Sequence, residues 1–215
     1  MLIIVPAYNE AGSVGRVVRG LFELGFENVL VIDDGSTDKS FQEASRAGAK
    51  VFRHEINRGQ GASLETGNEY ARRKGFDTVV HFDGDDQFNP ADISGALKKI
   101  ETGECDIVLG SRFLDNRSKL PFLKRYFILP IARIINFLFT GVWLSDAHNG
   151  FRVLGSDALD KIRINQDGMA HNTEIIKQIK KHGLKYCEYP VEVRYNEFGQ
   201  GIKEGVEIIW DLLIR

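Results

Sequence analysis

The chain has 215 residues, of which 43% are hydrophobic and 27% are charged, an ordinary composition for a globular protein. This length predicts one large domain, and a formal net charge of −2 argues against the basic field of a nucleic-acid-binding protein. Cys105 and Cys187 lack CxxC spacing, so we expect neither a disulfide framework nor a zinc site, and we expect a reducing, cytoplasmic environment.

The first half of the chain alternates between apolar runs that predict buried strands and segments with helical periodicity. The first strand pattern begins at once, so we expect no signal peptide. This alternation is typical of right-handed βαβ units and predicts an α/β fold with a mostly parallel sheet. Neither a GxGxxG nor a GxxxxGKS/T phosphate loop is present. The expected strands are residues 2–5, 29–32, 50–54, 77–82 and 106–109, and the expected helices are residues 13–25, a segment ending at 48, residues 57–73 and a segment from 89 onward.

The second half is less regular, and residues 122–144 form its most apolar stretch. Charged and polar residues interrupt this stretch, so we do not expect a clean transmembrane span. A narrow polar stripe at helical spacing suits an amphipathic helix that lies in a membrane interface. The alternatives are a dimer-forming helix, or a helix packed on the protein's own core with the stripe facing water. The stripe consists of Arg125, Arg133, Asn136 and Thr140.

Shorter elements are expected after this stretch. A helix at 169–182 would place His171, Glu174 and Gln178 on one face, either as part of a site or as a solvated group. His148 and Asn149 could simply shape a turn. The other expected elements are strands at 153–154 and 184–195 and a terminal amphipathic helix at 203–215.

The segment from His81 to Gln87 places a cluster of carboxylates directly after a predicted buried strand. In α/β proteins, ligands bind in the crevice at the carboxyl ends of the strands. Asp83 and Asp85 are two residues apart, so on an extended chain they point the same way, and Gly84 lets another group approach the backbone. Two convergent carboxylates suit a hard divalent cation that also binds phosphates. The alternative is a solvated acidic turn.

Four stretches, taken in order and spacing, resemble the motifs of family 2 glycosyltransferases: residues 6–10, 33–38, 57–62 and 83–87. Residues 110–112, with the sequence GSR, also recur in that family. Residues 146–152 are similar to the "D…GFR" motif of the polyprenyl-phosphate sugar transferases, the group that includes dolichol-phosphate mannose and glucose synthases. The resemblance is looser after residue 115. It implies a three-layer GT-A fold in one domain, with a nucleotide-sugar-binding half at 1–112 and an acceptor-side half at 113–215.

The resemblance also implies roles for individual residues. It implies that Asp85 and Gln87 hold Mg²⁺ or Mn²⁺, and that Asp83, a candidate for both metal binding and catalysis, faces the sugar and ribose. A metal there would neutralise the charge on the leaving diphosphate. Matching positions for the base and ribose are Pro6, Tyr8, Glu10, Ile32, Asp34 and Gly84. Candidates for binding phosphate are Arg112, Arg194 and, more weakly, Lys203.

Several of these residues also have structural interpretations. Asp33 and Asp34 could cap a turn, although we favour a ligand role for Asp34. Residues 57–61 could be only a loop that opens a helix, and Arg112 could be a surface residue. We expect Asp146 to face the acceptor, where a carboxylate could act as general base. A lipid-phosphate acceptor is already an anion and needs no base.

The C-terminal segment departs from the family pattern. The mannose synthases carry a compact Arg-x-x-Gly-x-Ser-Lys segment, whereas this chain has a longer spacing from Arg194 to Lys203 and lacks the Ser. The acceptor is therefore left open, with a polyprenyl phosphate favoured.

From the resemblance we expect a metal-dependent inverting glycosyltransferase of cell-envelope glycan or glycolipid synthesis, with a UDP- or GDP-linked sugar as donor. The expected location is the cytoplasm or the inner face of the cell membrane. The expected partner is a membrane surface, a membrane protein or a second copy of the chain, and no nucleic acid is expected. The alternatives are a sugar-1-phosphate nucleotidyltransferase and a non-catalytic nucleotide-sugar-binding module. Residues 6–10 argue against the nucleotidyltransferase, because that class has a Gly-rich, basic loop at this position.

Overall fold

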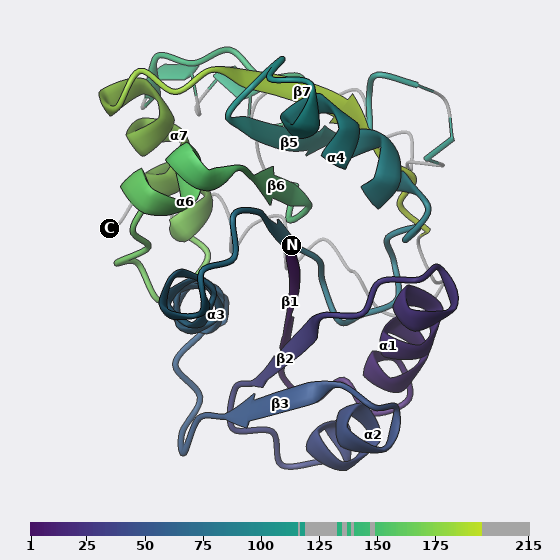
Figure 1. Ribbon diagram of the computed structural model, residues 1–215. Helices are drawn as coiled ribbons and strands as arrows, with labels where there is room; N and C mark the ends of the chain where they lie inside the picture. The colour runs from purple at the N-terminus through teal and green to yellow at the C-terminus, as the bar shows by residue number, and fades with distance from the viewer. Residues whose placement is uncertain (116, 119–132, 135–136, 139, 147–148, 195–215) are drawn as a thin grey trace.

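In the computed structural model, a seven-stranded sheet runs through the middle of the molecule in the order β3-β2-β1-β4-β6-β5-β7 (Figure 1). The structure describes residues 1–115, 117–118, 133–134, 137–138, 140–146 and 149–194. The strands are β1 (Leu2–Ala7), β2 (Val29–Asp33), β3 (Lys50–Arg53), β4 (Val79–His81), β5 (Ile107–Ser111), β6 (Arg152–Leu154) and β7 (Tyr186–Pro190).

The predicted α/β fold with a mostly parallel sheet is confirmed. Strands β1 to β4 pair in parallel, and so do β5 and β7. The exception is β6, which lies antiparallel between β4 and β5. Strand β1 has β2 on one side and β4 on the other, so the strand order reverses at β1. In an open α/β sheet, the carboxyl ends of the strands at such a reversal are where ligands bind.

Helices cover both faces of the sheet and form the outer two of three layers (Figure 1). One core contains buried side chains from α1 and α4, and the other contains buried side chains from α3, α6 and α7. The helices are α1 (Val14–Glu23), α2 (Ser40–Arg46), α3 (Gln60–Lys74), α4 (Asp92–Glu101), α6 (Ser156–Lys161) and α7 (His171–Lys181). Helix α6 was not predicted, because six residues are too few to show a helical period.

Three sequence-based expectations lie wholly or partly outside the described residues. The terminal helix at 203–215 lies wholly outside them, as does the turn residue His148. Of the apolar stretch at 122–144, the structure describes residues 133–134, 137–138 and 140–144. Among the helices that the structure describes, none combines the length and the hydropathy needed to cross a membrane.

The expectation that the two cysteines form no disulfide is wrong. Cys105 and Cys187 are bonded, with their Cα atoms 5.9 Å apart. Cys187 lies in β7, which pairs in parallel with β5, and Cys105 lies two residues before β5. The sheet pairing brings together two residues that are 82 positions apart in the sequence.

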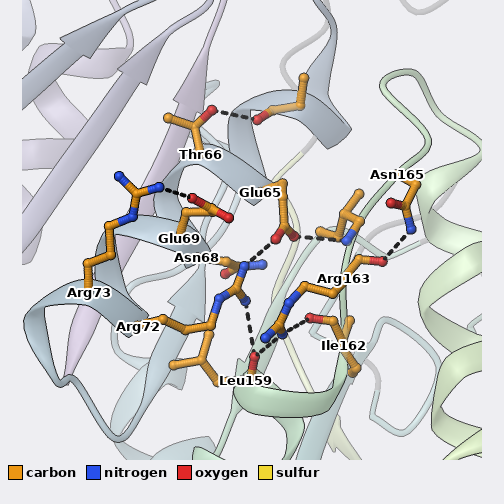
Figure 2. Close-up of polar contacts among 12 residues, drawn as sticks. Glu65, Thr66, Asn68, Glu69, Arg72, Arg73, Leu159, Ile162, Arg163 and Asn165 are labelled. Carbon is orange, nitrogen blue, oxygen red and sulfur yellow. Dashed lines mark hydrogen bonds and ion pairs between the residues drawn. The ribbon is translucent and has the colours of Figure 1, made fainter.

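Helix α3 matters for the site because its first residues line the cavity described below. Figure 2 shows how side chains on this helix attach it to α6 and to the segment that follows α6. Arg72 pairs with Glu65 and donates to the backbone oxygen of Leu159 at 3.0 Å, while Glu65 accepts from the backbone nitrogen of Ile164 at 2.8 Å. These contacts fix the rotation of α3 relative to the acceptor-side half of the chain.

Close packing of α3 on β1 predicts opposite effects for one substitution at two helix glycines. A Cβ atom at Gly67 would lie 2.5 Å from Cγ2 of the buried Ile4, so Gly67→Ala should destabilise the protein by about 1–3 kcal/mol. At Gly20 in α1 the nearest atom would lie 3.9 Å away, so Gly20→Ala should stabilise by about 0.5–1 kcal/mol. Urea denaturation measures both, and equal effects would contradict this packing.

Candidate active site

A cavity of about 410 Å³ opens at the carboxyl ends of β1, β2 and β4. All four stretches that carry the family resemblance contribute to its wall, so segments spread over eighty residues of sequence meet at the strand-order reversal. The lining residues are Pro6, Ala7, Tyr8, Glu10, Asp34, Asn57, Gly59, Gln60, Ser63, Asp83, Gly84 and Asp85.

The loop after β1 is held by side chains from the segment after β2. The backbone nitrogens of residues 9 to 12 donate in turn to the side chains of Ser36, Ser40, Asp38 and Glu43, at 2.6–3.0 Å. Four consecutive N–H groups of an irregular loop are thereby satisfied without a helix or a strand. The loop that carries Tyr8 and Glu10 is therefore fixed before any ligand binds.

Asp34 connects the segment after β2 to the loop before α3. Its carboxylate contacts His54 Nδ1 at 2.7 Å and accepts from the backbone nitrogens of Arg58 and Gly59 at 3.0 and 2.7 Å. Asp34 lines the cavity, but these partners already occupy its oxygens. Its contact with the base or ribose stays a prediction, and the structure adds a role in shaping the loop at 57–59.

The expectation of an extended chain at Asp83 and Asp85 is wrong, because β4 ends at His81 and the backbone turns at residues 84–86. Both carboxylates nevertheless line the cavity, together with that of Glu10. Burial, followed by the charge of Asp85, raises the pKa of Asp83 to about 7. Burial also raises the pKa values of Asp85 and Glu10. The charge of the buried Arg152 lowers the pKa of Asp83 and so offsets part of this effect, but the residues that line the cavity include these three carboxylates and, among the described residues, no Lys or Arg.

The carboxylates of the cavity fit a divalent cation whose remaining ligands would come from the substrate and from water. The cavity lining has no lysine or arginine among the described residues, so a bound cation would reduce the repulsion between an anionic diphosphate and Asp83 and Asp85. Within the ranges that the structure describes, no group of three or more His, Cys, Asp and Glu side chains forms a ready metal site. Mg²⁺ is bound through one or two carboxylates plus phosphate oxygens and water, and Asp83 and Asp85 match that requirement.

Two glycines let backbone and carboxylate pack closely around Asp83. A Cβ atom at Gly150 would lie 2.4 Å from Oδ2 of Asp83, and one at Gly84 would lie 3.0 Å from the backbone oxygen of Pro6. Gln60 donates from Nε2 to the other oxygen of Asp83 at 2.8 Å. Asp83 is thus held from two sides. The sequence-based site did not include Gly150 or Gln60, although both lie inside stretches that carry the resemblance.

Arg112 and Asp146 form a buried pair with each other. Arg112 donates from Nε and Nη2 to the two oxygens of Asp146 at 2.6 and 2.7 Å, and their side chains are only 15% and 1% exposed. Burial alone would raise the pKa of Asp146, but the charge and hydrogen bonds of Arg112 outweigh it, so that pKa is lowered. An ionised carboxylate that is this firmly bound is a weak base.

A second polar group, formed by Glu188, Ser145 and Ser111, lies beside the Arg112–Asp146 pair. Glu188 accepts from the backbone nitrogen and hydroxyl of Ser145 at 2.8 and 2.5 Å, and Ser145 also contacts the hydroxyl of Ser111 at 2.5 Å. Asn149 donates to Asp146 at 3.3 Å. These contacts fix the backbone on both sides of the ion pair. Sequence reasoning missed Glu188 and Ser145, because their neighbours are distant in sequence.

Other predicted site residues lie away from the cavity wall. The side chain of Ile32 is fully buried in the core beside α3, and its implied role in holding the base or ribose stays a prediction. Gln87 accepts through its backbone oxygen from the backbone nitrogen of Arg194 at 2.8 Å, which places the exposed Arg194 beside the acidic loop. Ile32, Gln87 and Arg194 do not line the cavity, and the ligand roles of all three stay predictions. Lys203 lies outside the described residues.

Of two further structural interpretations, one agrees with the structure and one is corrected. Asp33 is fully buried, accepts from the backbone nitrogen of Ser36 at 3.3 Å and pairs with Arg53 at 3.1 Å, so it caps the turn as expected and lies outside the cavity. His171 does not form a solvated pair with Glu174, because it is 1% exposed and its Nδ1 contacts the backbone oxygen of Gly168 at 2.8 Å. Burial, followed by the nearby charge of Arg152, lowers the pKa of His171 to about 4.

The chain is similar to known proteins over almost its whole length. The chain is 31% identical over 223 residues to an uncharacterized protein of Methanocaldococcus jannaschii, covering 100% of this chain and 91% of the relative. It is 28% identical to the UDP-N-acetylglucosamine–dolichyl-phosphate N-acetylglucosaminyltransferase of Methanococcus voltae, covering 99% of this chain and 94% of that enzyme.

A solved structure shares the fold. Glucosyl-3-phosphoglycerate synthase from Mycobacterium tuberculosis, in complex with Mn²⁺, UDP-glucose and phosphoglyceric acid, superposes with a TM-score of 0.72 at 19% identity. The match covers 98% of this chain and 77% of that one. The Glycosyl transferase family 2 model matches residues 2–163, which include every strand of the sheet except β7. The chain belongs to glycosyltransferase family 2.

Proposed function

We propose that this enzyme transfers a sugar from a nucleotide-diphosphate sugar to a polyprenyl phosphate, with inversion at the anomeric carbon. The observation that carries the proposal is the acid-lined cavity at the strand-order reversal, whose lining lacks Lys and Arg among the described residues. The dolichyl-phosphate enzyme of Methanococcus voltae, which aligns over almost the whole chain, supports the acceptor class and makes a UDP-linked sugar the first donor to test.

The donor would lie in the cavity with its base and ribose toward the loop after β1. Tyr8 is 46% exposed there and offers an aromatic face to a base, while Glu10 and Asp34 offer acceptors to hydroxyl and N–H groups. Asp83 and Asp85 would hold Mg²⁺ or Mn²⁺, which when bound supplies positive charge to the leaving diphosphate. Gln60 keeps Asp83 oriented through its hydrogen bond.

The reaction is a single displacement. An oxygen of the acceptor phosphate forms a bond to the anomeric carbon, the bond from that carbon to the diphosphate oxygen breaks, and the nucleoside diphosphate leaves with the electron pair. The acceptor oxygen is already anionic, so no proton has to be removed. This agrees with the state of Asp146, whose lowered pKa and two bonds to Arg112 make it a poor general base. We therefore propose a positioning role for Asp146, which replaces the expected general-base role.

A thermal-shift series with matched variants tests the donor site. UDP-sugars should raise the melting midpoint of the wild type only when Mn²⁺ or Mg²⁺ is present, because ligand that binds only the folded state stabilises it. Asp85→Asn should lose this metal-dependent shift. Asp86→Asn is the control, since Asp86 pairs with Arg16 on the surface, lies outside the cavity and already has a backbone conformation that asparagine tolerates. An unchanged metal-dependent shift in Asp85→Asn would sink the metal assignment.

The buried ion pair predicts a large cost for removing one partner. Asp146→Ala leaves the buried Arg112 without its carboxylate and should lower the free energy of unfolding by about 3–5 kcal/mol. Glu69→Ala removes the carboxylate of an exposed pair with Arg73 and should cost at most about 0.5 kcal/mol. Urea denaturation compares the two variants. Similar small losses in both would show that the Arg112–Asp146 pair does not hold the acceptor side together.

A further inference from the structure

Asp34 lines the donor cavity, but one of its hydrogen bonds comes from a side chain that does not. The side chain of Asp34 is 4% exposed, and that of His54 beside it is 11% exposed. His54 Nδ1 contacts Oδ1 of Asp34 at 2.7 Å. An ionised carboxylate only accepts hydrogen bonds, so Nδ1 is the donor. His54 is not among the residues of the cavity wall, so it can affect a ligand there only through Asp34.

The ring of His54 is held at both nitrogens and through its backbone. Nε2 contacts the hydroxyl of Thr66 in α3 at 3.0 Å. The backbone nitrogen of His54, directly after β3, donates to the backbone oxygen of Asp33 at 2.9 Å. These contacts join the ends of β2 and β3 to α3 and fix the orientation of the ring. Asp34 therefore receives the hydrogen bond of Nδ1 from a fixed direction.

The other partners of Asp34 leave it room for a ligand. The backbone nitrogens of Arg58 and Gly59 donate to it at 3.0 and 2.7 Å, so that with His54 three N–H groups bind the carboxylate. An ionised carboxylate offers about four acceptor positions. One position therefore remains for a hydroxyl or N–H group of a molecule in the cavity that Asp34 lines.

The carboxylates proposed to bind metal are held by other groups. Gln60 at the start of α3 donates to Asp83 at 2.8 Å, and Gly150 packs against the second oxygen of Asp83. The start of α3 is itself fixed by the backbone oxygen of Asp167, which accepts from the backbone nitrogen of Gly61 at 2.8 Å. These contacts do not include His54. The two ends of the cavity are therefore positioned by separate sets of hydrogen bonds.

We propose that His54 is a positioning residue for the nucleoside end of the donor. It orients the carboxylate of Asp34 so that the remaining acceptor position meets a hydroxyl or N–H group of the nucleoside. The proposal rests on the proposed function, because it takes the nucleoside of the donor to lie against Asp34. The expected consequence is specific: His54 should matter for a ligand that carries a nucleoside and not for a bare diphosphate.

Substitutions at His54 separate the roles of its two nitrogens. The side-chain amide nitrogen of asparagine lies the same number of bonds from Cα as Nδ1 does, and that of glutamine matches Nε2. His54→Asn should therefore keep a donor to Asp34, whereas His54→Gln and His54→Phe should lose it. His182→Phe is the control, because His182 is exposed at the end of α7.

Calorimetry in the presence of Mn²⁺ measures the affinity of each variant for UDP and for inorganic pyrophosphate. His54→Phe and His54→Gln should bind UDP about tenfold more weakly, because a hydrogen bond to a charged group is lost, and should bind pyrophosphate as the wild type does. His54→Asn and His182→Phe should bind both ligands as the wild type does. A general loss of folded protein would affect both ligands equally and could not produce this difference.

Unchanged UDP affinity in His54→Phe, or equal losses for UDP and pyrophosphate, would overturn the proposal. So would UDP affinity that His54→Gln preserves and His54→Asn loses, since the contact with Thr66 would then be the important one. If the wild type binds UDP with Mn²⁺, these results leave the proposed function intact. Absence of Mn²⁺-dependent UDP binding in the wild type would overturn the proposed function itself.

Discussion

The repulsion among carboxylates in one cavity is the constraint on which the active site depends. Asp83, Asp85 and Glu10 gather where the strand order reverses, and the pKa of Asp83 is raised to about 7 because burial and its neighbour both oppose its charge. A protein tolerates such an arrangement where a cation offsets it. Under the proposed function, that cation is a divalent metal that binds together with the nucleotide diphosphate.

The rest of the fold keeps these groups in place. Side chains after β2 satisfy the backbone of the loop after β1, Asp34 holds the loop before α3, and Gln60 at the start of α3 orients Asp83. Glu188 and the Arg112–Asp146 pair fix residues 145 and 146 against β5 and β7. Each contact joins segments distant in sequence, so these groups are preorganised relative to the sheet.

Local patterns predicted the strands and helices of the first half well, because buried parallel strands are continuous apolar runs and the polar residues that end them stand out. The same property limits the prediction at Ile32, since a strand that is buried on both faces does not reveal which of its residues lies near a ligand. The direction of the three-residue β6, the pairing of Arg112 with Asp146 and the Cys105–Cys187 bond depend on tertiary contacts across 34 or more positions, which no local pattern records.

Thermodynamic coupling between metal and nucleotide tests the central claim most directly. Free Mn²⁺ can be measured by electron paramagnetic resonance during titration with and without UDP, and UDP affinity can be measured by calorimetry with Mn²⁺ or with EDTA. Each ligand should strengthen the other by the same factor, in the range of about 5- to 150-fold, because coupling between two binding equilibria is reciprocal. UDP that binds equally well in EDTA would contradict the claim that this acid-lined cavity needs a cation to hold its donor.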